Sequence, residues 1–385
     1  MFNSSRIKQF SNIATPFYYY DMETLQNTLE IVKRESSKYG YHVHYAVKAN
    51  ANPTIMTKIQ SYGFGADCVS GNEIKRSLET GYPSNKIVYA GVGKSDQEIQ
   101  TALDSNIFCF NCESIPEMEL INELAAKSNK VAQIAIRINP NVNAHTHHYI
   151  TTGVEENKFG ISRWEFEDIL KGLASYTNIK LIGFHFHIGS QITDLSVFKG
   201  LCIRINEIKQ WFADRHVVVD HINVGGGYGV DYQHPDKNPI PDFVTFFKIF
   251  DEFLELDPNQ ELHFELGRSM VAQCGSLISK VLYVKNGVKT KFAILDAGMT
   301  ELLRPALYQA FHKIENLSSD KEKENYDVVG PICESSDCFG KSVLLPETKR
   351  NDLIAIRSAG AYGEAMASSY NLRNIAPSIF SNELN

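Results

Sequence analysis

The sequence predicts an α/β fold in which a (β/α)8 barrel is combined with a second, β-rich domain. Two observations lead to this prediction. Eight short apolar segments alternate with amphipathic helical segments between residues 43 and 266, which is the length expected of a (β/α)8 barrel. Beyond residue 270, strand-like segments follow one another without long helices between them, as is typical of a β-rich domain.

The elements of the barrel are predicted from the spacing of apolar residues. The strands are expected over residues 43–48, 64–69, 86–90, 107–111, 133–138, 182–188, 221–225 and 261–266. The helices are expected over residues 23–38, 55–62, 72–80, 97–103, 115–126, 164–174, 198–212 and 243–256. Because helices separate consecutive strands, we expect the strands to pair in parallel.

The predicted helix starts agree with this alternation. Several strand-to-helix connections carry the pattern Ser-x-x-Glu, in which the serine oxygen can accept from a free helix N–H while the glutamate reaches back. A single match is common by chance, whereas repeated matches at the expected places favour the predicted order of elements. The pairs are Ser70/Glu73, Ser95/Glu98, Ser114/Glu117 and Ser162/Glu165.

The β-rich domain is predicted to draw on both ends of the chain. Its strands are expected over residues 271–284, 291–295, 328–329, 342–345 and 352–356, and the strand-like segment 17–20 has no partner in the barrel pattern. We therefore assign residues 24–270 to the barrel and residues 1–23 and 271–385 to the second domain. The charge-rich segment 318–325 is interpreted as a solvated loop.

Composition excludes several classes of protein. Lysine and arginine number 38 against 45 acids, a net charge of −7, so a polyanion-binding surface is not indicated. No apolar run approaches the ~20 residues that span a bilayer, and the first residues lack the apolar segment of a signal peptide. Seven scattered cysteines, an odd number, fit reduced thiols in the cytoplasm.

Polar residues follow the predicted strands at their carboxyl ends, where (β/α)8 enzymes place their chemistry. They are Lys48, Asp67, Asn111, Arg137, His187, Gly225, Gly226, Gly227, Glu265 and Arg268. Lys48 can form an imine with an aldehyde, and the glycines let backbone N–H groups approach a phosphate. Glu265 can keep a pyridine nitrogen protonated, and His187 can lie against a ring. The set predicts a phosphorylated, heteroaromatic aldehyde cofactor.

Each of these residues also has a purely structural explanation. Lys48 can be a solvated loop lysine, the glycines a flexible turn, His187 a packed core imidazole and Glu265 a partner of the neighbouring arginine. Their joint occurrence at one barrel mouth favours the cofactor. A second cluster resembles a metal site but has no carboxylate or cysteine at ligand-like spacing, so we expect no metal; it consists of His145, His147 and His148.

Nine motifs resemble those of the diaminopimelate decarboxylases, which are pyridoxal-phosphate enzymes. They are AVKAN (46–50), INPNV (138–142), THHYITTGVEENKFGI (146–161), GFHFHIGSQI (183–192), NVGGGYG (223–229), ELGRS (265–269), RPALY (304–308), GPICESSD (330–337) and GAYG (360–363). Single motifs are shared with ornithine, arginine and carboxynorspermidine decarboxylases, and the combination of RPALY with CESSD is the specific part. The resemblance implies an alanine-racemase-like barrel with a β-domain.

The resemblance also implies roles for individual residues. Those expected to hold pyridoxal 5'-phosphate are Lys48 as the covalent attachment point, His187 against the ring, Glu265 at the ring nitrogen, and Ser190, Gly225, Gly226, Gly227, Gly267, Arg268 and Tyr362 around the rest of the cofactor. Those expected to bind the substrate are Arg268, Arg304 and Tyr308 at a carboxylate, Glu334 at the distal ammonium, and Tyr362. Cys333 is expected to protonate the reacting carbon. Leu266 stands where the family usually has proline.

The implied reaction is the decarboxylation of meso-2,6-diaminopimelate to L-lysine and CO2, the last step of lysine biosynthesis. The implied active unit is a homodimer in which Cys333 and Glu334 complete the partner's site, with no nucleic-acid or membrane partner. The alternatives are a decarboxylase of a related diamine precursor (carboxynorspermidine, ornithine or arginine), a racemase and a non-catalytic cofactor carrier. Glu334 argues against the first, the lack of a clear second tyrosine base against the second, and the β-rich domain against the third.

Overall fold

The computed structural model describes residues 2–142 and 158–384, and the chain divides into two compact units. The barrel unit comprises residues 29–229 and 242–267, and the β unit comprises residues 1–28, 230–241 and 268–385. The histidine cluster His145, His147 and His148, considered above as a metal site, lies outside the described residues.

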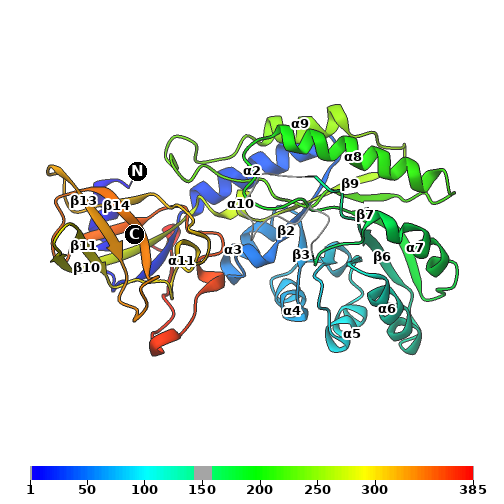
Figure 1. Ribbon diagram of the computed structural model, residues 1–385, viewed down its shortest axis with the longest axis horizontal. Coiled ribbons are helices and arrows are strands. Elements are labelled where there is room, and N and C mark those ends of the chain that lie inside the picture. Colours follow the sequence, from blue (N-terminus) through cyan, green and yellow to red (C-terminus); the bar gives the residue numbers. More distant parts are fainter. Residues whose placement is uncertain (1, 143–157, 385) are drawn as a thin grey trace. The chain divides into compact units, whose positions relative to one another are not determined.

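Within the described residues, eight parallel strands of the barrel unit close into a barrel, as predicted (Figure 1). Each predicted strand is present within a few residues of its expected bounds, and β2 pairs with both β3 and β9, which closes the ring. The strands are β2 (His42–Ala46), β3 (Gly65–Cys68), β4 (Ile87–Tyr89), β5 (Cys109–Cys112), β6 (Ala132–Arg137), β7 (Ile179–His185), β8 (His221–Asn223) and β9 (Glu261–Leu266).

One helix precedes these strands and the others connect them, and the helices bury apolar faces, as the spacing of apolar residues predicts. Helix α9, for example, buries Phe243, Phe246, Phe247 and Phe250. The helices are α2 (Met22–Ser37), α3 (Pro53–Gln60), α4 (Gly71–Glu79), α5 (Asp96–Ser105), α6 (Ile115–Lys127), α7 (Phe166–Leu173), α8 (Ser196–Ala213) and α9 (Phe243–Phe253).

The Ser-x-x-Glu pairs begin helices in two ways. At α5 the expected reciprocal box forms, since Ser95 accepts from the Glu98 N–H and Glu98 accepts from the Ser95 N–H. At α4 Ser70 accepts from the Glu73 N–H, but the Glu73 carboxylate accepts from Val69, one residue earlier than expected, at 2.7 Å. The glutamate thus binds the backbone N–H of the residue that directly follows β3. The first arrangement recurs at Ser162/Glu165 and the second at Ser114/Glu117.

The β unit contains a sheet with the strand order β12-β15-β10-β11-β13-β14, to which β1 and β16 are added through β10. The predicted strand at residues 17–20 is β1, and it pairs antiparallel with β10, Phe17 opposite Ile278. The strands are β1 (Phe17–Tyr20), β10 (Gly275–Asn286), β11 (Lys291–Leu295), β12 (Ile314–Asn316), β13 (Lys323–Val329), β14 (Cys338–Pro346), β15 (Leu353–Ile356) and β16 (Ser378–Phe380).

The β unit departs from the prediction at several places. The strand expected from residue 271 begins at Gly275, because helix α10 (Arg268–Val271) precedes it. The segment expected to be a solvated loop, residues 318–325, contributes its last residues to β13, where Lys323 pairs with Pro346. Its charged residues are exposed or half-buried, and a run of such residues resembles a loop when only the charges are counted. The short elements α1 (Ser4–Phe10), α11 (Arg304–Tyr308), β12 and β16 were not predicted.

Two further features bear on the sequence analysis. None of the described helices combines the length and apolarity that crossing a bilayer requires. The seven cysteines are all free thiols, of which Cys333 is exposed and Cys338 half-buried, while the other five are buried.

The close approach of β7 and β8 gives a prediction. A Cβ on Gly183 of β7 would lie 2.3 Å from the His221 backbone oxygen in β8, so Gly183→Ala should cost about 1–3 kcal/mol by overpacking. The matched control is Gly200→Ala in α8, where nothing lies within 4 Å of the added Cβ, and which should gain about 0.5–1 kcal/mol. Thermal unfolding followed by circular dichroism should give a lower midpoint for Gly183→Ala, and a higher midpoint for Gly200→Ala, than for the unmodified chain. Equal midpoints for Gly183→Ala and the unmodified chain would contradict this packing.

Candidate active site

Lys48 lies in a short 3-10 turn, Val47–Ala49, directly after β2. Its Nζ is 3.5 Å from Oδ2 of Asp67, a buried residue of the neighbouring strand β3. Burial, and after it the charge of Glu265, raises the pKa of Asp67 to about 8, although the charge of Lys48 opposes the rise. The amine at the strand end therefore stands beside an acid that can carry a proton near neutral pH.

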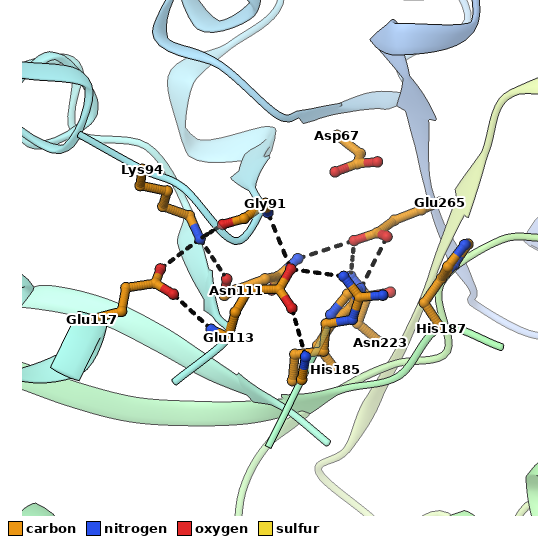
Figure 2. Close-up of polar contacts among 12 residues, drawn as sticks. Asp67, Gly91, Lys94, Asn111, Glu113, Glu117, His185, His187, Asn223 and Glu265 are labelled. Atoms are coloured by element: carbon orange, nitrogen blue, oxygen red, sulfur yellow. Dashed lines mark hydrogen bonds and ion pairs between the residues drawn. The ribbon is translucent and has the colours of Figure 1, made fainter. Parts of the chain in front are cut away.

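Glu265 is buried and its carboxylate accepts hydrogen bonds on both oxygens (Figure 2). Asn111 Nδ2 donates to Oε1 at 3.0 Å, Asn223 Nδ2 donates to the same oxygen at 2.8 Å, and His185 Nε2 donates to Oε2 at 3.0 Å. Burial alone would raise the pKa of Glu265. The charge of His185, together with the hydrogen bond that His185 donates, instead holds this pKa below its usual range. The side chain is thus kept as a carboxylate in the barrel interior.

His187 and the three glycines after β8 lie together. The Gly226 N–H donates to His187 Nδ1 at 3.3 Å, which leaves the proton of a neutral ring on Nε2. Burial, followed by the charges of Arg137 and Lys48, lowers the pKa of His187 well below its usual value, so the ring is neutral. A neutral imidazole can stack on an aromatic ring without the cost of a desolvated charge.

The glycine turn accepts no other residue type. Gly225 and Gly227 have φ of 68° and 98°, which favours glycine, and a Cβ on Gly226 would lie 1.9 Å from the Glu265 backbone oxygen. The Ile192 N–H donates to the Gly227 oxygen at 2.9 Å, so the loop that contains Ser190 runs beside this turn. The turn thus offers closely approaching backbone, which is what binding of a phosphate requires.

Two buried ion pairs stabilise the neighbouring strand ends (Figure 2). Arg137 donates to Glu113 at 2.7 Å, and Lys94 donates to Glu117 and to the backbone oxygens of Gly91 and Asn111. Burial would raise the pKa of Glu113, but Arg137 and Lys94 hold it below the usual value. Since both acids also accept backbone N–H groups, the pairs fix the loops around the barrel mouth.

In the β unit, two guanidinium groups lie beside Tyr232. Arg268 donates to the Tyr232 hydroxyl at 2.8 Å and lies 4.7 Å from the Tyr362 ring centre, while Arg304 lies 4.8 Å from the Tyr232 ring centre. Both arginines are buried. Tyr362 itself has a φ of 56°, an uncommon conformation for a bulky residue, and its ring packs against Arg268.

Arg304 is positioned by His312. His312 Nδ1 lies 2.8 Å from the Arg357 backbone oxygen, which can only accept, so the ring carries its proton there and its bare Nε2 accepts from Arg304 at 2.7 Å. Burial and then Arg304 lower the pKa of His312 to about 3. The Nε of Arg304 has no hydrogen-bond partner among the residues that the structure describes, so this buried cation retains a donor for an anion.

Cys333 and Glu334 lie in a loop that is built around the buried Asp337. The Asp337 carboxylate accepts from the Ile332 N–H at 2.7 Å and from the Met299 N–H at 2.6 Å. Both Cys333 and Glu334 are exposed. The Cys333 N–H donates to Asn371, and Tyr370 donates to the Glu334 carboxylate at 2.7 Å. The loop is thus held in shape while its thiol and carboxylate face outward from this chain.

The structure brings the predicted site residues into two groups, one in each unit. At the strand ends of the barrel unit lie Lys48, His187, Ser190, Gly225, Gly226, Gly227, Glu265 and Gly267. Gly267 lies where a Cβ would meet the Ala46 and Ala49 Cβ atoms at 3.0 Å, and the preceding Leu266 is a buried strand residue opposite Tyr45. The β unit holds Arg268, Arg304, Tyr308, Cys333, Glu334 and Tyr362, with Tyr308 half-buried at the end of α11.

Several residues that support these groups were not predicted from the sequence. His185 and Asn223 hold Glu265, and each lies two positions before a predicted site residue, so the period of two along a strand was an available signal. Tyr232 and His312 hold the arginines of the β unit, and no motif marks either of them. Their roles follow from the tertiary structure alone.

Comparison with known proteins gives consistent matches. Residues 24–272 match the family model of the pyridoxal-dependent decarboxylase, pyridoxal binding domain. The chain is 59% identical to a diaminopimelate decarboxylase of Bacteroides thetaiotaomicron over 379 residues, 98% of each chain. The crystal structure of diaminopimelate decarboxylase from Helicobacter pylori complexed with L-lysine is similar with a TM-score of 0.91 at 38% identity, covering 97% of this chain and 93% of that one.

The same fold also occurs in a more distant protein. The crystal structure of lysine/ornithine decarboxylase from Vibrio vulnificus complexed with cadaverine is similar with a TM-score of 0.86 at 20% identity, covering 99% of this chain and all of that one. At this level of identity the similarity concerns the fold alone.

The raised pKa of Asp67 predicts a pH dependence of stability. A folded-state pKa of about 8 means that the folded chain keeps a proton which the unfolded chain releases near pH 3.8. Stability therefore falls as pH rises from about 4 to about 8, and above about pH 8 both states are ionised and Asp67 adds no further pH dependence. Asp67→Asn has no acid to ionise there. In the cofactor-free protein, its thermal midpoint should therefore rise relative to the unmodified chain between about pH 5 and about pH 8.

The control for this measurement is Asp220→Asn, which changes an exposed aspartate and should leave the pH profile parallel to that of the unmodified chain. A parallel profile for Asp67→Asn as well would mean that Asp67 is ionised throughout this range, contrary to the expectation.

Proposed function

We infer the function of this chain from its family: the chain belongs to the pyridoxal-dependent decarboxylases and, within them, to the diaminopimelate decarboxylases. It is a carboxy-lyase that uses pyridoxal 5'-phosphate to convert meso-2,6-diaminopimelate into L-lysine and CO2, the last step of lysine biosynthesis. The structural observation that carries the chemistry is the buried, fully hydrogen-bonded carboxylate of Glu265 at the barrel mouth.

The barrel unit fits the cofactor. Lys48 supplies an amine at the end of β2, the turn at Gly225–Gly227 has space for backbone only, and the loop with Ser190 runs beside it. These are the groups that an aldehyde and a phosphate require. When bound, the cofactor supplies an electron sink for the pair of electrons left on the α-carbon as CO2 leaves.

We assign the residue roles as follows. Lys48 binds the cofactor covalently, and Asp67, 3.5 Å from its Nζ, holds a proton beside the amine. Glu265 holds the proton on the pyridine nitrogen, because a carboxylate kept ionised by its neighbours attracts a cation at that atom. His187 packs against the ring as a neutral imidazole, and Gly225–Gly227, Ser190, Gly267, Arg268 and Tyr362 bind the remainder of the cofactor.

Recognition of the substrate's distal end is assigned to charged residues of the β unit. Arg268 and Arg304 are buried guanidinium groups beside Tyr232, and a carboxylate is the substrate group that they can bind by paired hydrogen bonds. Tyr308, one helical turn after Arg304, adds a hydroxyl. Glu334 binds the distal ammonium. Together these residues would distinguish a distal amino-acid group from the simpler ends of ornithine and arginine.

Cys333 is assigned as the acid that protonates the α-carbon after CO2 leaves. Because Cys333 and Glu334 are exposed and their loop is held by Asp337, we propose that they complete the site of a partner subunit in a homodimer. A loop that presents a thiol and a carboxylate outward is suited to that role.

We also propose domain boundaries and a cellular location for this enzyme. We propose residues 24–270 as the cofactor-binding domain, supported by the family match over residues 24–272, and residues 1–23 and 271–385 as the β-domain. We also propose a cytoplasmic location, which the seven free thiols support.

The substrate assignment is tested by kcat/KM for meso-diaminopimelate beside L-lysine, L-ornithine and L-arginine. The unmodified enzyme should prefer meso-diaminopimelate. Losing a charged partner in a closed site costs ~2–4 kcal/mol, or roughly 30- to 1,000-fold in kcat/KM, so Arg304→Ala and Glu334→Ala should each lose activity by that order. Neither change should prevent covalent binding of the cofactor to Lys48, which borohydride reduction and mass spectrometry can verify.

The matched control is Arg163→Ala, which removes an exposed arginine of the barrel unit and should retain activity. A preference of the unmodified enzyme for ornithine or arginine would reject the substrate assignment. Full activity of both Arg304→Ala and Glu334→Ala would reject the roles given to these side chains while leaving the family chemistry intact.

The shared site is tested by mixing two inactive variants. Lys48→Ala and Cys333→Ala subunits should each lack activity, but a hybrid dimer has one site with both residues intact. Random reassortment makes about half of the dimers hybrid, so about a quarter of the activity should return. If activity stays absent after subunit exchange has been demonstrated with labelled chains, each subunit builds its own site.

A further inference from the structure

A cluster of histidines lies inside the barrel at the amino-terminal ends of its strands. His42 and His44 come from β2, His221 from β8 and His263 from β9, and His42 is the strand partner of His263. Along β9, Glu261, His263 and Glu265 alternate with buried apolar residues and so share one face. Glu265 serves the cofactor end of the barrel, while Glu261 lies at the opposite end of the same strand.

The hydrogen bonds of this cluster determine which ring nitrogens carry protons. His44 Nδ1 lies 3.1 Å from the Lys86 backbone oxygen, which can only accept, so His44 carries its proton on Nδ1 and its Nε2 is a bare acceptor. His263 Nδ1 lies 2.9 Å from that Nε2 and must therefore donate to it. A neutral His263 then has a bare lone pair on its Nε2.

That lone pair faces another acceptor. His263 Nε2 is buried and has no hydrogen-bond partner among the described residues, and Glu261 Oε2 lies 3.5 Å from it. Two acceptors held this close repel each other unless a cation lies between them.

The geometry fits a metal ion. The Nε2 of His42 is 3.8 Å from Glu261 Oε2, and the ligand atoms of His42, Glu261 and His263 all lie within 4.8 Å of one another. Ligands at ~2.1 Å from a tetrahedral zinc ion are about 3.4 Å apart, so small side-chain movements bring these atoms into range. The N–H of His263 bound to His44 is the outer hydrogen bond that metal-ligating histidines usually make.

We propose that His42, Glu261 and His263 form a binding site for a divalent transition metal of the zinc type, separate from the cofactor site. The side chains of His42 and Glu261 are 49% and 60% exposed, so an ion can enter from solvent and a water molecule can complete the coordination. Imidazole and carboxylate ligands suit zinc. Since the ligands come from β2 and β9, the ion links the first and last strands where the barrel closes.

His44 and His221 have supporting positions in this proposal. His44 positions His263 by accepting its N–H, and the His221 ring packs against His263 at a centroid distance of 4.0 Å. Gly65 is required here, because a Cβ would lie 2.4 Å from His44 Nδ1. The site departs from the expectation of a metal-free protein, because its ligands are far apart in the sequence and adjacent only across the β2–β9 pair.

The test uses isothermal titration calorimetry of the cofactor-loaded enzyme with zinc chloride in a non-chelating buffer. The unmodified enzyme should bind zinc at a site that His42→Asn and Glu261→Gln each weaken by at least about tenfold, as expected for loss of a direct ligand. Both changes affect exposed side chains, so the barrel should stay folded. Zinc should also raise the thermal midpoint of the unmodified enzyme more than that of either variant, because binding to the folded state alone stabilises it.

The matched control is His216→Asn, which makes the same substitution at an exposed histidine outside the cluster and should leave zinc affinity unchanged. Asparagine tolerates the positive φ of 63° at this position. Binding that all variants share is assigned to the histidines at 145–148 or to the cofactor. If the unmodified enzyme binds no zinc, or if His42→Asn and Glu261→Gln bind it as tightly as the unmodified enzyme does, the proposal is wrong.

Discussion

The barrel unit depends on keeping one carboxylate ionised in its interior. An isolated buried carboxylate costs several kcal/mol, and Glu265 avoids that cost because β5, β7 and β8 each supply a donor to it. These donors reach Glu265 only if the strands are parallel, closed and in the observed register. Because the side-chain period of a strand is two, a slip of one residue would turn the donors away from the interior. The hydrogen bonds to Glu265 and the closure of the barrel thus require the same strand register.

The same alternation of side chains produces a polar interior along the whole of β9. Apolar residues such as Leu262 and Phe264 face the surrounding helices, while Glu261, His263 and Glu265 face inward. Each inward polar group needs partners, and the structure supplies them in layers: amides and His185 around Glu265, and histidines around His263. The two ends of one strand therefore carry separate arrangements of buried polar groups.

The β unit also keeps charged groups buried among supporting side chains, but here the charges are positive. Arg268 and Arg304 are buried beside Tyr232, and the bare Nε2 of His312 accepts from Arg304. Buried guanidinium groups supported by aromatic rings and a neutral imidazole retain an attraction for anions, which suits recognition of a carboxylate. In the loop with Cys333, by contrast, a buried carboxylate, Asp337, accepts backbone N–H groups and fixes the loop.

The order and type of the main elements could be predicted from the sequence, because helix and strand periods are local properties of the chain. The sequence also indicated Lys48 and Glu265 as strand-end residues, since the end of an apolar segment is visible in sequence. It did not predict α1, α11, β12 or β16, which are too short to show a period. Nor did it predict the partners of the site residues: His185, Asn223, Tyr232 and His312 act through contacts across strands and loops, and the three-dimensional register alone decides which side chains meet.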